Sequence, residues 1–189
     1  VNMIFISEMM SNELVDLTTY KQQLFLKNGV DNTISTNDFD SLLKTRLVDD
    51  TVNVLHLSNM IKEKGYDTVL ELVKKVKEQN LNVEFNFAGA WASKEDELYF
   101  NEFVKDNNLE DVVKYHGLVG GEEKRNIFKN ANLFIFPSRY SKEVFPLSLL
   151  EALSYGLPIL TFDVGAVADI IDNKIGVVTD ANSIFESFI

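Results

Sequence analysis

Two carboxylates, Glu143 and Glu151, stand eight residues apart in the segment EVFPLSLLE. Glu143 precedes Pro146, and Glu151 falls inside the apolar helix that this proline is expected to open. A carboxylate one turn into an apolar helix is costly to bury alone, so a ligand hydroxyl or a basic group should satisfy it. The pair could act as an acid/base couple or as a ligand clamp. The structural alternative is that Glu151 pairs with a lysine or caps a neighbouring helix.

Cationic and polar groups elsewhere in the chain could also take part in ligand binding. Lys62 and Lys64 lie in a short loop before a helix, a suitable place to hold phosphate, although a lysine in a loop is commonly only solvated. The first-turn N–H groups from Leu147 onward could face a bound anion. His116 ends a predicted strand and could reach a ligand, although packing is its more common role. His56 falls within a strand and is expected to be a core residue.

Several kinds of chemistry have no support in the sequence. There is no Cys and no His, Asp or Glu cluster with metal-ligand spacing, so no disulfide and no tightly bound metal are expected. No Gly-x-Gly-x-x-Gly fingerprint follows a strand, which counts against NAD or FAD. Ser138 and Ser148 lack the context of a nucleophile elbow.

The elements that must position these residues alternate regularly from Val52 onward. Predicted strands alternate with predicted helices, which indicates a doubly wound parallel sheet of the α/β class. The strands are Val52–Leu57, Val83–Gly89, Val112–Gly117, Leu133–Phe136, Pro158–Phe162 and Gly176–Thr179. The helices are Thr68–Gln79, Ser93–Asn107, Glu122–Asn130, Pro146–Tyr155 and a short Ala166–Ile171, with Asp67 and Ser93 as predicted N-caps.

The first fifty residues are less regular. A strand is predicted at Val1–Ser7, a helix at Asn12–Tyr20, a second strand at Gln23–Leu26 and a polar linker at Thr33–Asp50. The chain opens in an apolar segment and closes about two turns into a helix, so it is interpreted as a piece of a longer protein. The predicted domains are residues 1–50 and residues 51–189, the second truncated at its C-terminus.

Composition narrows the class of protein. The 189 residues are 46% hydrophobic and 25% charged, as in a globular chain with a sizeable core. The net charge of −11 argues against nucleic acid and against anionic lipid as partners, because both need clustered Lys and Arg. No run is long enough to span a membrane, and no signal peptide is evident, so a cytoplasmic location is expected.

At this point the segment FPSRYSKEVFPLSLLEALSYGLPILTFDVGAVADII resembles the signature of retaining GT-B glycosyltransferases of the group 1 type. The hallmark of that family is two Glu residues separated by seven others, met here by Glu143 and Glu151. Further matches follow in order along the chain: NGVD, SNMIKEKG, FAG, HG and GLP. The resemblance implies two Rossmann-like domains around a cleft. This chain would be nearly all C-terminal, donor-binding domain, with residues 1–50 as a remnant of the acceptor domain and the crossover.

The resemblance also implies roles for individual residues. Glu143 should contact the donor sugar, Glu151 the ribose hydroxyls, and Lys64 should neutralise the diphosphate so that it can leave. Backbone near Phe145 and Leu147 should approach the sugar and phosphate. The base should lie near Gly117–Val119, with Ser138 and Arg139 completing the donor-binding set.

Three departures from the family pattern stand out. The phosphate loop has Asn59 where the family usually has an arginine, so Arg139 becomes the candidate for the missing charge. The usual Gly-Phe-Gly after the first Glu is Val144-Phe145-Pro146. The acceptor domain, with its helper histidine, is missing, so this fragment should bind donor without appreciable transfer.

The resulting hypothesis is the donor half of a retaining, metal-independent glycosyltransferase of hexosyl type, serving polysaccharide biosynthesis. It needs no cofactor and takes a UDP-, GDP- or ADP-linked sugar as co-substrate. The acceptor, a sugar or lipid, belongs to the missing domain, and a longer protein could sit against the inner face of a membrane, although this half does not support membrane contact. The alternatives are a nucleotide-sugar epimerase of the same architecture, which would rely on Glu143 and His116, and a non-catalytic binding module.

Overall fold

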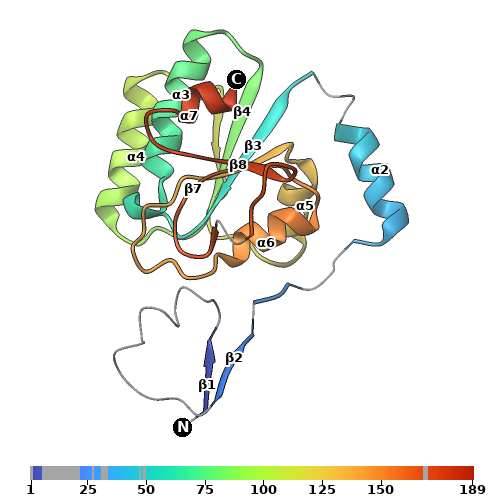
Figure 1. Cartoon of the computed structure of the whole chain (residues 1–189). Coiled ribbons are helices and arrows are strands. Elements are labelled where there is room, and N and C mark those ends of the chain that lie inside the picture. Colours follow the sequence, from blue (N-terminus) through green and yellow to red (C-terminus); the bar gives the residue numbers. More distant parts are fainter. Residues whose placement is uncertain are drawn as a thin grey trace.

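The computed structural model describes residues 2–5, 22–26, 28–30, 34–46, 48, 50–167 and 170–189. Its centre is a six-stranded parallel sheet with the strand order β5-β4-β3-β6-β7-β8 (Figure 1). The strands are β3 (Val52–Leu57), β4 (Val83–Ala88), β5 (Val113–Tyr115), β6 (Leu133–Phe136), β7 (Ile159–Phe162) and β8 (Gly176–Thr179). The predicted doubly wound parallel sheet is confirmed, and each of these strands lies where the sequence pattern predicts it.

The strand order reverses at the centre of the sheet. The chain places β3, β4 and β5 side by side and then returns to lay β6 on the other side of β3. Val54 of β3 is opposite Leu133 of β6, so the first and fourth strands of the sheet are neighbours. Open α/β sheets bind ligands outside the carboxyl ends of the strands at such a reversal. The loops that follow Leu57 and Phe136 are therefore the place where this fold can build a site.

Helices cover both faces of the sheet (Figure 1). One layer holds α3 (Tyr66–Glu78), α4 (Lys94–Asp106) and α7 (Ile184–Phe188), and the other holds α2 (Thr36–Arg46), α5 (Gly121–Asn130) and α6 (Leu147–Ser154). A short 3-10 helix, η1 (Lys62–Lys64), precedes α3. Within the described ranges, no helix has the length and apolar character needed to cross a membrane.

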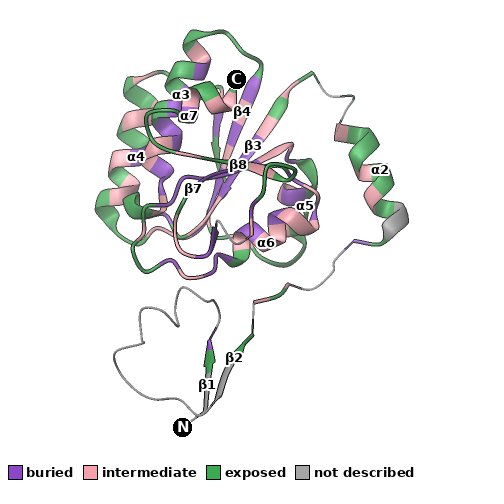
Figure 2. Ribbon diagram, viewed as in Figure 1, coloured by how far each residue is buried: buried purple, intermediate pink, exposed green. Residues whose placement is uncertain are grey.

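The strand sequences are apolar because both faces of the sheet are buried. Val54 and Ile135 point into the cluster beneath α3 and α4, whereas Leu55 and Phe134 point into the cluster beneath α5 and α6. This alternation follows from the two-residue period of a strand. Figure 2 shows the buried residues concentrated along the strands and on the inner sides of the helices.

The two predicted helix N-caps differ in outcome. The hydroxyl of Ser93 accepts a hydrogen bond from the backbone N–H of Asp96 at the start of α4, which confirms this N-cap. The prediction for Asp67 is wrong, because α3 begins at Tyr66, two residues before the predicted start at Thr68, and its N-cap is Gly65. The carboxylate of Asp67 instead accepts from Thr68 N and pairs with Arg139. Asn80 takes a positive φ of 53°, a conformation in which a helix cannot continue.

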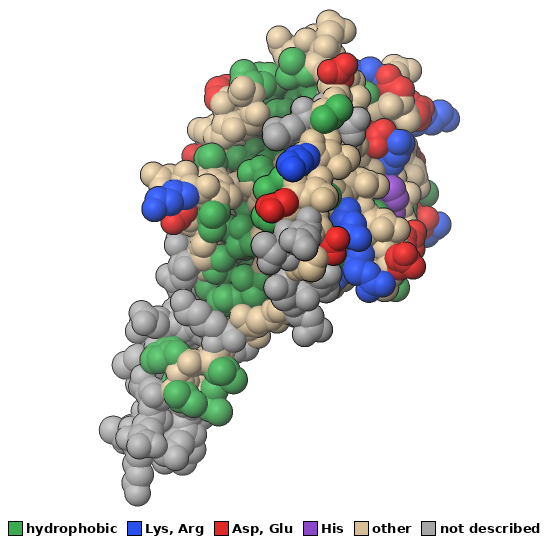
Figure 3. Space-filling model, turned by 90° about the vertical axis from the view of Figure 1, so that its right-hand side faces the viewer, with side chains coloured by type: hydrophobic (Ala, Val, Ile, Leu, Met, Phe, Trp, Pro, Cys, Tyr) green, Lys and Arg blue, Asp and Glu red, His purple; other side chains and the backbone are tan. Residues whose placement is uncertain are grey.

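The start of the chain forms a small parallel pair, β1 (Asn2–Phe5) and β2 (Gln22–Phe25), in agreement with the two predicted strands. This pair lies below the main sheet in Figure 1. Its side chains Ile4, Leu24 and Phe25 are exposed, and Figure 3 shows hydrophobic side chains at the surface in the lower part of the molecule. The predicted helix at residues 12–20 lies outside the described residues, as do residues 168–169 of the predicted helix at 166–171. The assignment of residues 1–50 to a second domain stays a prediction.

The prediction of a linker between Thr33 and Asp50 is wrong, because α2 occupies most of that range. The hydroxyl of Ser35 accepts from the backbone N–H of Asp38, which satisfies a donor at the start of the helix. The ring of Phe39 packs directly against Gly156. A Cβ on Gly156 would lie only 2.5 Å from this ring, so a larger residue would displace it. With few apolar residues, α2 has a weak sequence pattern, and it packs against the core through Phe39 and Leu42.

Arg46 fastens the end of α2 to the neighbouring helices. Its Nη1 donates to the carbonyl of Tyr155 at 2.7 Å, and its Nη2 donates to the carbonyl of Phe128 at 2.9 Å. These carbonyls lie at the C-terminal ends of α6 and α5, where a cation is favoured by the helix dipole. Burial lowers the pKa of Arg46, but the two carbonyls stabilise its charge. One side chain therefore joins three helices.

We expect Arg46→Met to lower the free energy of unfolding by about 2 kcal/mol, because two charge-assisted hydrogen bonds are lost. Urea denaturation measures the change. Lys44→Met, an exposed change on the same helix, is the control and should stay within about 0.5 kcal/mol of wild type. Equal stability of the two variants would show that α2 does not fold together with the sheet.

His56 is buried in the middle of β3, with 1% of its surface exposed. Its Nδ1 lies 3.1 Å from the carbonyl oxygen of Ile135, and its Nε2 lies 3.0 Å from the hydroxyl of Ser58. Burial lowers the pKa of His56 from 6.5 to about 4, an effect that Lys64 reinforces and that the Ile135 carbonyl and Asp67 oppose. The ring is therefore neutral in the folded protein at neutral pH.

This pKa predicts an acid-sensitive stability. Between about pH 6.5 and pH 4 the unfolded chain binds a proton at His56 that the folded protein does not, so stability falls as the pH falls. The loss between pH 7.5 and pH 5 should be about 2 kcal/mol. Urea denaturation at both pH values should show this loss in the wild type and a smaller one in His56→Gln, which cannot titrate. An equal loss in both proteins would contradict the assignment to His56.

Candidate functional site

A cavity of about 480 Å³ lies at the carboxyl ends of β3 and β6, where the strand order reverses. We call it the main cavity because it lies at this reversal. The loop after β3, the loop after β5, the start of α5 and the segment that leads into α6 all contribute to it. The residues that line it are Leu57, Ser58, Asn59, Lys64, Gly89, Leu118, Val119, Lys124, Phe136, Glu143, Phe145, Pro146, Leu147, Ser148 and Glu151. It therefore contains two carboxylates and two ammonium groups.

The loop that carries Lys64 is held against the end of β6. Gly65 has a φ of 91°, and a Cβ on this residue would lie 2.2 Å from the carbonyl oxygen of Pro137. Only glycine permits both the left-handed conformation and this close approach. The backbone N–H of Arg139 donates to the carbonyl of Glu63 at 2.6 Å, which joins the same two loops. Lys64 is thus positioned by packing between two segments that are distant in sequence.

Lys64 forms an ion pair with Glu143, whose side chain is 8% exposed. The ammonium group also lies 4.9 Å from the centre of the Tyr140 ring. A carboxylate this deeply buried needs a partner, and Lys64 provides it. The loop of Glu143 is in turn packed against Gly165, where a Cβ would come within 2.2 Å of the Glu143 carbonyl oxygen. The structure therefore brings together Glu143 and Lys64, the two residues assigned catalytic roles from sequence.

A second ion pair joins Glu151 of α6 to Lys124 of α5, with Nζ and Oε1 2.6 Å apart. Both side chains keep more than a quarter of their surface exposed, so solvent or a ligand can reach them. Pairing of Glu151 with a lysine was the structural alternative to a ligand role. Sequence reasoning did not find Lys124, because it used only the acidic residues in the first turn of that helix.

The start of α6 separates the two glutamates. Pro146 is the N-cap residue of this helix rather than its first helical residue, and Leu147 begins the helix with 51% of its side chain exposed. Phe145 is buried, and its carbonyl accepts a hydrogen bond from Asn28 at 3.4 Å. The first-turn N–H groups of α6 have no partner within the helix, which is the usual arrangement of an anion site.

Seven of the ten residues predicted for the site line the cavity: Lys64, Glu143, Glu151, Asn59, Phe145, Leu147 and Val119. Gly117, Ser138 and Arg139 are not among its lining residues. Gly117 follows β5 and its carbonyl accepts from Gly89, while Ser138 is buried and its hydroxyl accepts from the backbone N–H of Tyr140.

The expectation that Arg139 supplies a missing positive charge does not fit the geometry. Both oxygens of Asp67 accept from its Nη2, at 2.9 and 2.8 Å, and the carbonyl of Lys62 accepts from the same atom. The guanidinium is thus engaged at the start of α3. The positive charge in the cavity comes instead from Lys64 and from Lys124, and sequence reasoning missed Lys124.

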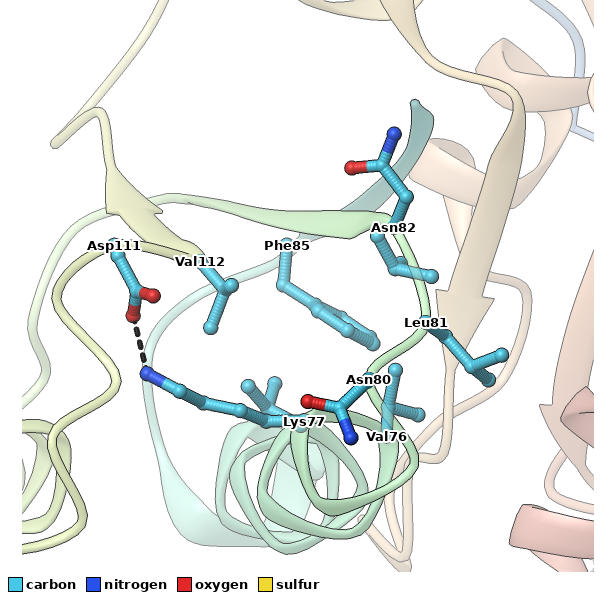
Figure 4. Close-up of a pocket in the computed structure, with 10 residues that line it drawn as sticks. Val76, Lys77, Asn80, Leu81, Asn82, Phe85, Asp111 and Val112 are labelled. Atoms are coloured by element: carbon cyan, nitrogen blue, oxygen red, sulfur yellow. Dashed lines mark hydrogen bonds and ion pairs between the residues drawn. The ribbon is translucent and has the colours of Figure 1, made fainter. Parts of the chain in front are cut away.

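Other cavities differ in their chemistry. The one in Figure 4, of about 280 Å³, lies at the amino ends of β4 and β5 and is lined by Val76, Phe85 and Val112. Its only lysine, Lys77, pairs with Asp111 at 2.5 Å, as the dashed line in Figure 4 shows. A hollow of about 410 Å³ adjoins the main cavity and shares Lys124, Leu147 and Glu151 with it. The Lys124–Glu151 pair therefore lines both of these spaces.

The charged groups of the main cavity can bind a ligand that carries both hydroxyls and phosphates. Carboxylates accept hydrogen bonds from hydroxyls, and ammonium groups donate to phosphate oxygens. Among the residues that the structure describes, no group of three or more His, Asp or Glu side chains could hold a metal ion.

Comparison with known proteins gives the family of the chain. The sequence model of a family described as glycosyl transferases group 1 matches residues 40–187. A 2-deoxystreptamine N-acetyl-D-glucosaminyltransferase from Niallia circulans is 30% identical over 132 residues, which cover 70% of this chain and 32% of that protein. The chain spans about a third of the length of the curated relatives that it matches.

Solved structures share the fold. Sucrose-phosphate synthase from Thermosynechococcus elongatus superposes with a TM-score of 0.77 at 21% identity, over 99% of this chain and 48% of that one. HepE from Anabaena, solved in complex with UDP, superposes with a TM-score of 0.77 at 18% identity, over 98% of this chain and 53% of that one. The family model covers most of the chain, and the sheet with its flanking helices recurs in these proteins. The chain therefore belongs to the glycosyl transferases group 1 family and has a Rossmann-like fold that matches GT-B glycosyltransferases.

Proposed function

We propose that this chain binds the nucleotide-diphosphate-sugar donor of a retaining, metal-independent glycosyl transfer. The observation that carries the proposal is the placement of the Lys64–Glu143 and Lys124–Glu151 pairs in one cavity at the strand reversal. HepE from Anabaena has been solved with UDP and with UDP-glucose, which favours a nucleotide-sugar as the ligand.

The diphosphate is the part of the ligand that Lys64 should contact. Its ammonium group is held beside Glu143 in a largely buried position, where a charge acts more strongly than in water. The first-turn N–H groups of α6 supply further donors near the same point. Together they would stabilise the negative charge that develops on the departing nucleoside diphosphate.

The two carboxylates should bind the hydroxyl groups of the ligand. Glu143 would accept a hydrogen bond from the donor sugar while it stays paired with Lys64. Glu151 would accept from the ribose, and one of its oxygens already accepts a hydrogen bond from Lys124. Nucleotide binding should therefore either share or displace this ammonium group.

The parts of the activity beyond donor binding are proposals about a longer protein. Transfer of a hexosyl group needs an acceptor, which the N-terminal domain of a two-domain enzyme would hold, so this fragment alone should be inactive. One relative, AmsK of Erwinia amylovora, is named as a glycosyltransferase of amylovoran biosynthesis, which favours a biosynthetic role. Polysaccharide synthesis on the cytoplasmic side of the membrane is part of the same proposal. The acceptor would be a sugar or a lipid.

An epimerase is less well supported. It would need a second acid/base group beside Glu143, and His116 is the candidate. Nε2 of His116 lies 2.7 Å from Oδ1 of Asn86, and His116 does not line the cavity.

Isothermal titration with UDP, GDP and ADP and with their sugars tests the proposal. At least one pair should bind with a dissociation constant below about 1 mM, equivalent to about 4 kcal/mol. Failure of all of them to bind would overturn the assignment of a donor site.

We expect Glu151→Gln to weaken the binding nucleotide by about tenfold, because the ribose loses a charged acceptor. Inorganic pyrophosphate, which has no ribose, should bind equally to variant and wild type. Glu122→Gln, an exposed change of equal charge near the start of α5, serves as control. Equal losses of affinity for nucleotide and for pyrophosphate would show that Glu151 does not contact the ribose.

Lys64→Met should have two effects. Nucleoside diphosphate affinity should fall about tenfold with nucleoside affinity unchanged, because only the phosphates lose a charged donor. The free energy of unfolding should fall by about 2 to 3 kcal/mol, because Glu143 stays buried without its partner. The double variant Lys64→Met/Glu143→Gln should regain stability but not diphosphate affinity. Recovery of both would show that Lys64 acts only through folding.

A further inference from the structure

Ser58 stands where β3 ends and the cavity begins. Its side chain lines the cavity, and its hydroxyl oxygen lies 3.0 Å from Nε2 of His56. The two residues are two positions apart in an extended segment, so their side chains lie on the same side of the backbone. His56 itself is buried between β4 and β6 and cannot reach a ligand. A buried ring and a cavity-lining hydroxyl thus form one short polar chain.

The contact between His56 and the carbonyl of Ile135 determines which ring nitrogen carries the hydrogen. Nδ1 of His56 faces the carbonyl oxygen of Ile135, which can only accept, so Nδ1 must be the donor. Burial lowers the pKa of His56 to about 4, so the ring carries only that one hydrogen at neutral pH. Nε2 is then left with a lone pair.

The direction of the hydrogen bond between His56 and Ser58 follows from the contact between His56 and Ile135. A lone pair on Nε2 requires Ser58 to donate its hydroxyl hydrogen to the ring. The carbonyl of Asn59, also 3.0 Å from the hydroxyl, is the competing acceptor. Donation to Asn59 would leave two lone pairs facing each other across 3.0 Å inside the protein, a buried acceptor without a donor. A serine hydroxyl has a single hydrogen, so its remaining capacity toward the cavity is acceptance.

We propose that His56 is a positioning residue that makes Ser58 an acceptor toward the ligand, so that Ser58 binds a hydroxyl of the donor sugar and disfavours a phosphate oxygen. This inference rests on the proposed function, since it assigns one more contact to the nucleotide-sugar. Phosphate oxygens only accept, so they belong beside donors such as Lys64 and the amide of Asn59. Ser58 thereby adds to the specificity of the cavity for the sugar end of the ligand.

Three variants separate the role from simple packing. Ser58→Ala removes the acceptor. His56→Asn places its amide nitrogen near the position of Nδ1, which keeps a donor for Ile135 but removes the acceptor for Ser58. His56→Gln places an amide oxygen near the position of Nε2, which keeps the acceptor for Ser58. Both His56 variants cost stability, but only His56→Asn releases the hydroxyl hydrogen of Ser58.

The measurement is the affinity ratio between nucleotide-sugar and nucleotide, by calorimetry with UDP-glucose and UDP, GDP-mannose and GDP, and ADP-glucose and ADP. Ser58→Ala and His56→Asn should each weaken the binding nucleotide-sugar by about three- to tenfold and leave its nucleotide within about twofold, as expected for one hydrogen bond. His56→Gln should keep the wild-type ratio. Equal losses for both ligands, or the same ratio in the Asn and Gln variants, would overturn the proposal.

A measurement without ligand completes the test. Nitrogen-15 NMR of the wild type should show His56 at pH 7 with its hydrogen on Nδ1, and the Nε2-protonated form would overturn the proposal. If the wild type binds none of the six ligands, the proposed function fails and the ligand role of Ser58 fails with it. If it binds them and Ser58→Ala leaves the ratio unchanged, only the role of Ser58 fails.

Discussion

The pairing of β3 with β6 is the constraint on which the rest of the structure depends. These two strands are adjacent in the sheet although the chain builds β4 and β5 between them. Their carboxyl ends are therefore side by side, and the loops that follow diverge toward opposite halves of the sheet. The first loop carries Ser58, Asn59 and Lys64, and the second carries Glu143 and leads into α6. The main cavity lies where these two loops meet at the carboxyl ends of the two strands.

Charge balance is the second organising feature of the cavity. Each carboxylate in it is paired with a lysine from another element, Glu143 with Lys64 and Glu151 with Lys124. Removing charges from water is costly, and mutual pairing offsets part of that cost. A nucleotide-sugar brings both hydroxyls and phosphates, so it can satisfy the carboxylates and the ammonium groups at once. A ligand with only one of these groups leaves some of them paired to each other.

Two neutral polar residues, His56 and Ser58, connect the cavity to the core. His56 is buried beneath the cavity, and its tautomer is determined by a carbonyl of the neighbouring strand β6. Because this tautomer leaves a lone pair on Nε2, the hydroxyl of Ser58 donates its hydrogen to the ring. The β3–β6 pairing therefore sets the polarity of a side chain at the cavity surface, in addition to placing the loops. Arg46 acts at longer range, because it ties together the ends of the helices that carry Lys124 and Glu151.

The sequence by itself determined the sheet, most of its helices and the two glutamates of the site. These features are local: a buried strand is a run of apolar residues, and a covering helix repeats with a period of 3.6. Family resemblance added the pairing of Lys64 with the same site, which no local pattern indicates. The tertiary structure alone decided that α2 folds onto the core, where Phe39 meets Gly156 more than a hundred residues away. It likewise decided that Arg139 turns to Asp67 and that Lys124 meets Glu151. Long charged side chains can reach several partners, so their contacts depend on which distant segments the fold brings together, and no pattern along the chain records that.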